Sequence, residues 1–279
     1  MTVDTSPQLG RGRRIALRAV VIAFLLVGLA GLNFQLLLPL LSWLSDDSLV
    51  RVLDLPAEDL HHFLHGVGSA LTYGALLLVV AVQLRRPHRW VAPLWLGIFL
   101  LGTQAIYDAA QGTVGDPIWI VVYLLFAGVV AAHPRRAARI HPVDRPALAL
   151  AVVAAAPLAV YGWDHLRLQF GPEDTFGHAA DNHYYGIAAL ASVIIVAALL
   201  GATDLPGRRL TAWIAGIAPI LFAVASLAHA GKTSAWPAGW ALAAIGWGAG
   251  YLLAVEWRHR RAGIGSPETG GAGKIGSRG

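Results

Sequence analysis

The chain has 279 residues, of which 56% are hydrophobic and only 13% are charged. About a quarter of the residues in a soluble domain are charged, so this composition indicates an integral membrane protein. Cysteine is absent, which excludes disulfides, thiolate metal sites and cysteine nucleophiles. The net charge of +5 comes from arginines in short segments between apolar runs, a pattern typical of membrane orientation and not of nucleic-acid binding.

Eight segments have the composition of membrane-spanning helices. The first runs from about Ile15 to Trp43 and lacks the cleavage pattern of a signal peptide, so we expect it to be retained. Because about 20 apolar residues cross a bilayer, we place the other seven near 64–84, 90–110, 117–133, 146–163, 183–202, 211–229 and 237–256. We expect residues 1–13 to be a polar tail and residues 262–279, rich in Gly and Ser, to be a disordered tail.

The positive charges predict the orientation. On one side of the predicted helices lie only Arg51, Arg167 and Lys232. The other side, which includes the N-terminus, carries Arg85, Arg86, Arg89, Arg135, Arg136, Arg139, Arg145, Arg208, Arg209, Arg258, Arg260 and Arg261. Because positive loops stay inside, we expect a multi-pass protein of the bacterial inner (cytoplasmic) membrane with both termini cytoplasmic.

The order of landmarks indicates an internal duplication, with one unit at 14–140 and a second at 141–261. Trp43 and Trp163 end the first helix of each unit, and the pairs Glu58/His62 and Asp174/His178 precede the second. Each unit has an even number of crossings, which predicts parallel repeats. The expected fold is therefore all-α, a polytopic helical bundle of about eight transmembrane helices in two parallel four-helix repeats.

Carboxylates and histidines cluster before the second helix of each unit. An ionisable group inside hydrocarbon costs at least ~2.5 kcal/mol, so such clusters are either solvated at the membrane surface or part of a site. The third helices end on the same face, and antiparallel packing brings Asp108, Gln111 and His229 towards these clusters. We expect one extracytoplasmic region with the candidate ligand-binding residues Glu58, Asp59, Asp108, Gln111, Asp174 and Asp181, and the candidate metal or haem ligands His62, His65, His178, His183 and His229.

Other polar residues on this side are expected to be structural. We interpret Asp164 and Arg167 as charged residues of a loop. We interpret Tyr184, Tyr185 and most of the tryptophans as residues that anchor the helices at the membrane surface. Three chemistries remain open for the histidine-rich region. A divalent metal such as Zn²⁺ could activate water, paired histidines could hold a haem, or a metal-free polar cleft could bind a ligand. The spacing does not choose among them, and enzymatic activity stays open.

The first unit resembles the VanZ-like membrane proteins over about residues 58–130. Glu58-Asp59-Leu60-His61-His62-Phe63 is similar to the family pattern Asp-Lys-x-x-His-Phe, and Tyr107-Asp108-Ala109-Ala110-Gln111 to Asp-Glu-x-x-Gln. Asp116 matches a further family Asp at the start of the fourth helix. Asp59 replaces the family Lys and Tyr107 the first Asp of the second pattern, and the second unit keeps only Asp174 and His178, as a diverged duplicate would.

The resemblance implies a role at the cell envelope, since the family is associated with resistance to the glycopeptide teicoplanin; it supplies no reaction. The sequence therefore favours a membrane protein that binds or modifies an amphiphilic or lipid-linked ligand. The alternative is a haem- or metal-binding redox protein, or a subunit of a larger membrane complex.

Overall fold

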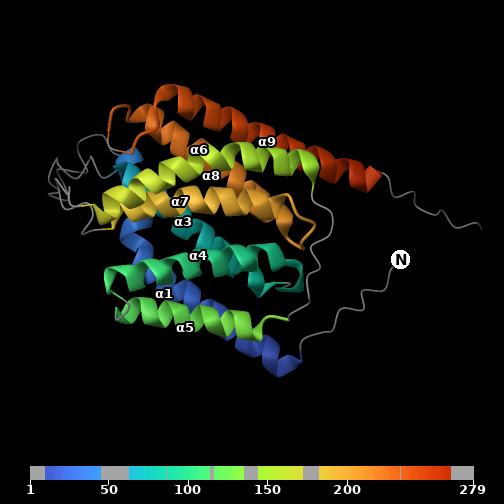
Figure 1. Cartoon of the computed structure of the whole chain (residues 1–279). Coiled ribbons are helices and arrows are strands. Elements are labelled where there is room, and N and C mark those ends of the chain that lie inside the picture. Colours follow the sequence, from blue (N-terminus) through green and yellow to red (C-terminus); the bar gives the residue numbers. More distant parts are fainter. Residues whose placement is uncertain are drawn as a thin grey trace, which may run out of the picture.

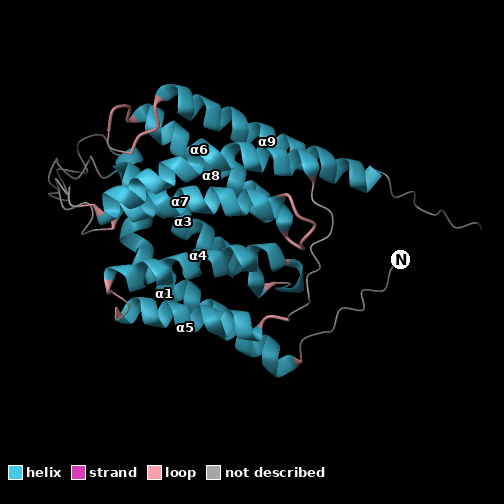
Figure 2. Cartoon of the chain, in the orientation of Figure 1, coloured by secondary structure: helices cyan, strands magenta, loops and turns pink. Residues whose placement is uncertain are grey.

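The computed structural model describes residues 10–44, 63–85, 87–113, 116–134, 144–171, 182–232 and 234–264. Over these ranges the chain forms eight α-helices and two short 3-10 helices, and it contains no strand (Figure 2). The helices are α1 (Arg11–Leu44), α3 (Phe63–Ala81), η2 (Val82–Leu84), η3 (Pro87–Arg89), α4 (Val91–Gln111), α5 (Pro117–Ala132), α6 (Arg145–Phe170), α7 (His183–Gly201), α8 (Arg208–Ala228) and α9 (Ala238–Ile264).

Six helices of the described chain are long and apolar enough to cross a membrane, namely α3 with η2, α4, α6, α7, α8 and α9, and α5 is a shorter apolar helix. This agrees with the predicted helical membrane protein. The expected end of α6 at residue 163 was wrong, because the helix continues to Phe170 and contains Asp164 and Arg167. A helix closes its own backbone hydrogen bonds whatever its side chains are, so it can outlast its apolar run.

The helices form a bundle in which α7 is central (Figure 1). Helix α7 contacts α3, α4, α6 and α8, while α1 packs on α3 and α5, and α9 packs on α6 and α8. Of the six candidate spans, α7 is the most buried and α6 and α9 are the least. The start of α1 and the end of α9 lie at the same end of the bundle (Figure 1).

Large apolar side chains cover the outside of the bundle. Ile106, Leu124, Val153 and Leu253 are each between 68% and 72% exposed although they lie on four different helices. Exposed apolar surface on this scale is unfavourable in water and favourable against lipid chains. The outer surface therefore fits a membrane-embedded bundle.

Glycines allow the closest helix contacts. A Cβ on Gly186 of α7 would lie 2.7 Å from Ser69 Oγ of α3. A Cβ on Gly248 of α9 would lie 2.5 Å from the backbone oxygen of Gly216 on α8. Small residues let helix backbones approach in membrane bundles, and these two positions hold α3 against α7 and α8 against α9.

The two ends of the bundle differ, and we name them by their side chains. The basic end holds the starts of α1 and α6 and the ends of α5 and α9. There Arg13 donates hydrogen bonds of 3.0–3.1 Å to the carbonyls of residues 131–133 at the end of α5. Arg258 on α9 pairs with buried Asp144 at 2.8 Å, and Asp144 also accepts a hydrogen bond from Ala147 N as the N-cap of α6.

The polar end holds the starts of α3, α5 and α7 and the ends of α4, α6 and α8. The expected antiparallel arrangement of the second and third helices is present, since α3 contacts α4 and α7 contacts α8. All of the candidate site residues that the structure describes lie at this end.

Candidate functional site

Five of the eleven candidate residues can be located. Asp108, Gln111, His65, His183 and His229 lie within the described helices or next to them. The predictions for Glu58, Asp59, His62, Asp174, His178 and Asp181 fall outside the described residues.

Asp108 is the centre of a buried polar network. Its side chain lies in the last turn of α4 and is only 3% exposed. Gln104 Nε2, one turn earlier, donates to Asp108 Oδ1 at 2.8 Å, and the Tyr123 hydroxyl of α5 donates to Oδ2 at 2.5 Å. Within the described chain no Lys or Arg lies within ion-pair distance of Asp108. Among the described residues, the side-chain donors to Asp108 are therefore both neutral.

A second group of hydrogen bonds, around Tyr107, joins the end of α4 to the start of α7. The Tyr107 hydroxyl donates to Asn182 Oδ1 and accepts from Gln111 Nε2 at 3.1 Å. Its ring stacks on Tyr185, with the ring centroids 3.7 Å apart. These bonds join Gln111 and Tyr107, at the end of α4, to the start of α7.

The histidines of the two predicted units meet directly. His65 of α3 is 1% exposed, and its Nδ1 lies 3.2 Å from the carbonyl oxygen of His183. A carbonyl can only accept, so Nδ1 of His65 carries the proton of this bond. The two rings are 5.3 Å apart, and the ring of Tyr184 lies 5.7 Å from that of His65.

The interpretation of Tyr184 and Tyr185 as interface anchors was wrong. Both side chains are buried, at 6% and 7% exposure. They lie in the first turn of α7, which is surrounded by α3, α4, α6 and α8. Their rings therefore pack in the interior, where Tyr185 stacks on Tyr107 and Tyr184 lies near His65.

His229 occupies a different environment from Asp108, although both were expected at the end of the third helix of a unit. It follows the last residue of α8, is half-buried and has its ring 4.2 Å from that of Phe63. Burial, and secondarily the nearby Lys232, lower the pKa of His229 below its usual value. A neutral imidazole is therefore favoured here.

A further group at the polar end was missed by the sequence interpretation. His165 of α6 is buried; its Nδ1 donates to the Tyr161 carbonyl at 2.8 Å and its Nε2 lies 2.8 Å from Ser234 Oγ. Tyr161 also donates to the backbone oxygen of Ser234 at 2.7 Å. Ser234 has φ of 67°, and these bonds fix the loop between α8 and α9 on α6. The sequence did show a histidine, His165, close to an apolar run, but we placed the end of that helix at residue 163, before His165.

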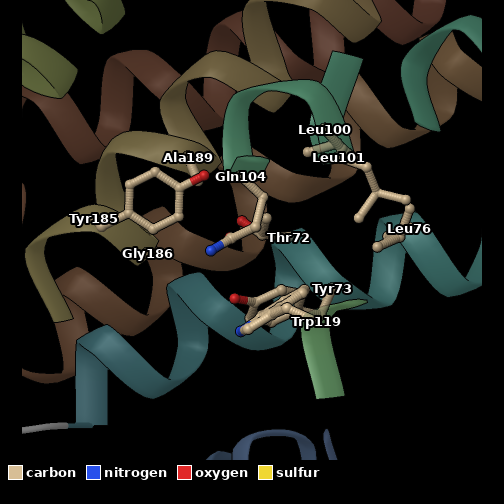
Figure 3. Close-up of a pocket in the computed structure, with 10 residues that line it drawn as sticks. All are labelled: Thr72, Tyr73, Leu76, Leu100, Leu101, Gln104, Trp119, Tyr185, Gly186 and Ala189. Atoms are coloured by element: carbon tan, nitrogen blue, oxygen red, sulfur yellow. The ribbon is translucent and has the colours of Figure 1, made fainter. Parts of the chain in front are cut away.

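A pocket lies between α3, α4, α5 and α7 (Figure 3), and one of its lining residues, Gln104, bonds Asp108. Its lining combines the rings of Tyr73, Trp119 and Tyr185 with the polar groups of Thr72 and Gln104, and is completed by Leu76, Leu100, Leu101, Gly186 and Ala189. About 350 Å³ is free of protein atoms, including the opening, but only about 20 Å³ admits the centre of a water molecule. A space of that size takes a water or one small polar group.

Among the described residues no group of three or more His, Asp or Glu side chains is arranged to hold a metal ion. His65 and His183 are close to each other, whereas His229 packs on Phe63. Asp116 is exposed and caps α5 by accepting from Ile118 N at 2.9 Å. The metal or haem prediction that involves His62 and His178 stays a prediction.

Comparisons with known proteins give no relative: no family model, no curated protein and no solved structure matches this chain.

Proposed function

We propose that this chain is a membrane protein that binds the polar part of an amphiphilic or lipid-linked ligand at its polar end. The supporting observation is Asp108, a buried carboxylate without an ion pair in the described chain, beside a pocket that opens between four helices. Buried charge without a counter-charge is unfavourable, and a group kept at such a position is a candidate for ligand recognition.

The two-unit organisation is part of the proposal. The contacts α1·α3, α3·α4 and α1·α5 correspond in order to α6·α7, α7·α8 and α6·α9. This correspondence supports two parallel four-helix repeats with the pocket where they meet, since its lining comes from α3, α4 and α5 of one unit and α7 of the other.

Orientation follows from charge. Arg13, Arg258 and most other described arginines lie at the basic end, and positive residues are retained in the cytoplasm. We therefore propose a bacterial inner-membrane location with the basic end cytoplasmic and the polar end facing the cell envelope. The resemblance to VanZ-like proteins supports the same role, because Asp108 and Gln111, which carry part of it, both form side-chain hydrogen bonds at the polar end.

The test is to purify the full chain in mild detergent and to identify the lipids and other amphiphiles that remain bound, by mass spectrometry of the extract. We expect about one bound amphiphile per chain, and its loss in Asp108→Asn. The matched control is Asp116→Asn, which changes an exposed carboxylate at the same end. Equal retention by wild type and both variants would contradict a site at Asp108.

The same sample decides the alternative. A metal-free, colourless and folded protein with a bound amphiphile supports the proposal. A haem absorption band or one metal per chain, with no bound amphiphile, would replace it with the redox interpretation.

A further inference from the structure

The pocket beside Asp108 has the walls of a cation site. Three aromatic rings line it, and the centroids of Tyr73 and Trp119 are 6.0 Å apart with an interplanar angle of 34°. The faces of tyrosine and tryptophan rings attract a cation within about 6 Å. None of the ten lining residues carries a positive charge, so the walls offer nothing that would neutralise an anion.

The carboxyl group of Asp108 lies next to a residue of the pocket lining. Gln104 lines the pocket and donates its amide to Asp108 at 2.8 Å. One side chain thus separates the pocket from the buried carboxylate, in an interior where charges are weakly screened. Asp108 has no ion-pair partner in the described chain, so a cation in the pocket would supply the missing counter-charge.

The pocket also contains a polar atom without a partner. Thr72 is 5% exposed, and its Oγ1 is buried and forms no hydrogen bond. A buried hydroxyl without a partner is unfavourable, and it is satisfied when a donor or acceptor enters. Thr72 belongs to the pocket lining (Figure 3), and its hydroxyl can accept a hydrogen bond from an incoming N–H group.

Size selects among cations. The pocket has room for about one water molecule. A primary ammonium group is close to water in size, whereas a trimethylammonium group is much larger. Thr72 lies nine residues into α3, about two and a half turns from the polar end, within reach of a headgroup that enters from that end.

We propose that the pocket between α3, α4, α5 and α7 binds a primary ammonium group, carried by an aminophospholipid headgroup or by a free small amine. This inference rests on the proposed function, since it names the chemistry that the polar end recognises. The ammonium N–H groups donate to Thr72 Oγ1, the rings of Tyr73, Trp119 and Tyr185 surround the charge, and Asp108 balances it through Gln104.

The lipid experiment places the full chain in bilayers of phosphatidylcholine doped with phosphatidylethanolamine or with phosphatidylglycerol, and counts bound lipids by native mass spectrometry. We expect selective retention of phosphatidylethanolamine. Losing a buried charge partner weakens binding by about tenfold or more, so this is the expected effect of Asp108→Asn. Losing one hydrogen bond weakens it by about fivefold, which is the expected effect of Thr72→Val.

Two variants serve as controls. Asp116→Asn removes an exposed carboxylate at the same end, and Thr211→Val alters a buried threonine of α8 that bonds Arg208 O at the basic end. Both should leave lipid selectivity unchanged. A loss in these controls equal to that in Asp108→Asn and Thr72→Val would overturn the assignment, because the effect would then be one of general stability.

The soluble arm titrates ethanolamine, ammonium chloride and choline chloride into the detergent-solubilised chain by calorimetry. Binding of ethanolamine but not choline supports the site. Binding of free amines without any lipid selectivity assigns the site to a soluble amine and contradicts the proposed amphiphile function. Retention of phosphatidylglycerol that depends on Asp108 would overturn the ammonium inference and leave the proposed function standing. No binding in either arm means a cavity filled by water only, and the inference fails.

Discussion

Two aspartates buried to the same degree, one at each end of the bundle, have opposite surroundings. Asp144 at the basic end is 5% exposed, pairs with Arg258 and caps α6. Asp108 at the polar end is 3% exposed, and its side chain bonds the neutral side chains of Gln104 and Tyr123. Asp144 thus has a cationic partner within the fold, whereas Asp108 has none among the described residues, and we propose that a bound ligand supplies it.

The largest expected contrast is between Asp144→Asn and Asp108→Asn. Asparagine also caps helices well, so the first change removes mainly the ion pair. We expect it to lower the free energy of unfolding by about 2 kcal/mol, below the range for fully buried pairs because Arg258 is half-exposed. In the unliganded protein, Asp108→Asn should change it by less than about 1 kcal/mol, because an amide can still bond Tyr123.

Chemical unfolding in mixed micelles, followed by circular dichroism, measures both changes. If Asp108→Asn destabilised the ligand-free protein as much as Asp144→Asn, the two carboxylates would have the same structural role.

Two tyrosine hydroxyls, those of Tyr123 and Tyr251, extend the comparison of the two ends. Tyr123→Phe removes a donor to the Asp108 carboxylate, and bonds to charged groups contribute more than neutral ones. We expect a loss of about 1.5 kcal/mol in unfolding free energy. Tyr251→Phe, which removes a 2.6 Å bond to the backbone oxygen of Ala198, should lose about 1 kcal/mol. Equal losses would show that the bond to Asp108 contributes no more than a bond to a backbone carbonyl.

The pH dependence of stability tests a third residue, His133 at the basic end. It is 2% exposed, and burial lowers its pKa from the usual 6.5, despite a 2.9 Å bond to the Pro87 carbonyl. As the pH falls below about 6.5, His133 is therefore protonated in the unfolded chain before it is protonated in the folded one. The stability that is fully present above this pH is lost as the pH falls towards the lower pKa of the folded state.

We expect the unfolding free energy to fall by about 1 kcal/mol between about pH 7.5 and about pH 5.5, and His133→Gln to remove part of that fall. The measurement is a set of denaturant titrations across this range. An unchanged slope in His133→Gln would assign the pH dependence to other groups.

The smallest effect is expected for the exposed ion pair at the basic end. Arg209 is 54% exposed and pairs with Glu256 through two hydrogen bonds of 2.6 and 2.8 Å. Surface pairs contribute about 0.5 kcal/mol, so Arg209→Gln should lower the unfolding free energy by about that amount and less at high salt. A loss as large as that in Asp144→Asn would show that burial does not distinguish the two pairs.

The pattern of apolar residues along the sequence predicts where the helices lie better than it predicts which helices pack against each other. The bounds of α3, α4, α7 and α8 agree with the apolar runs to within about three residues, because a spanning helix requires a run of fixed length. The end of α6 was missed because Asp164 and Arg167 interrupt the apolar run without ending the helix.

The same limit applies to the site. Asp108 and Gln111 were singled out as candidates because polar residues at the end of an apolar helix are conspicuous, and both form side-chain hydrogen bonds in the structure. The contact of His65 with His183 joins residues 118 apart in sequence, and no spacing rule gives such a pairing. The roles of Thr72 and His165 depend on which helix faces them, which only the tertiary structure supplies.

The most direct test measures ligand retention and stability side by side in the wild type, Asp108→Asn and Asp144→Asn, using native mass spectrometry and unfolding titrations on the same preparations. We predict that Asp108→Asn loses the bound amphiphile and keeps its ligand-free stability, whereas Asp144→Asn keeps the amphiphile and loses stability. Loss of the amphiphile in both variants, or in neither, would contradict the division of roles between the two ends.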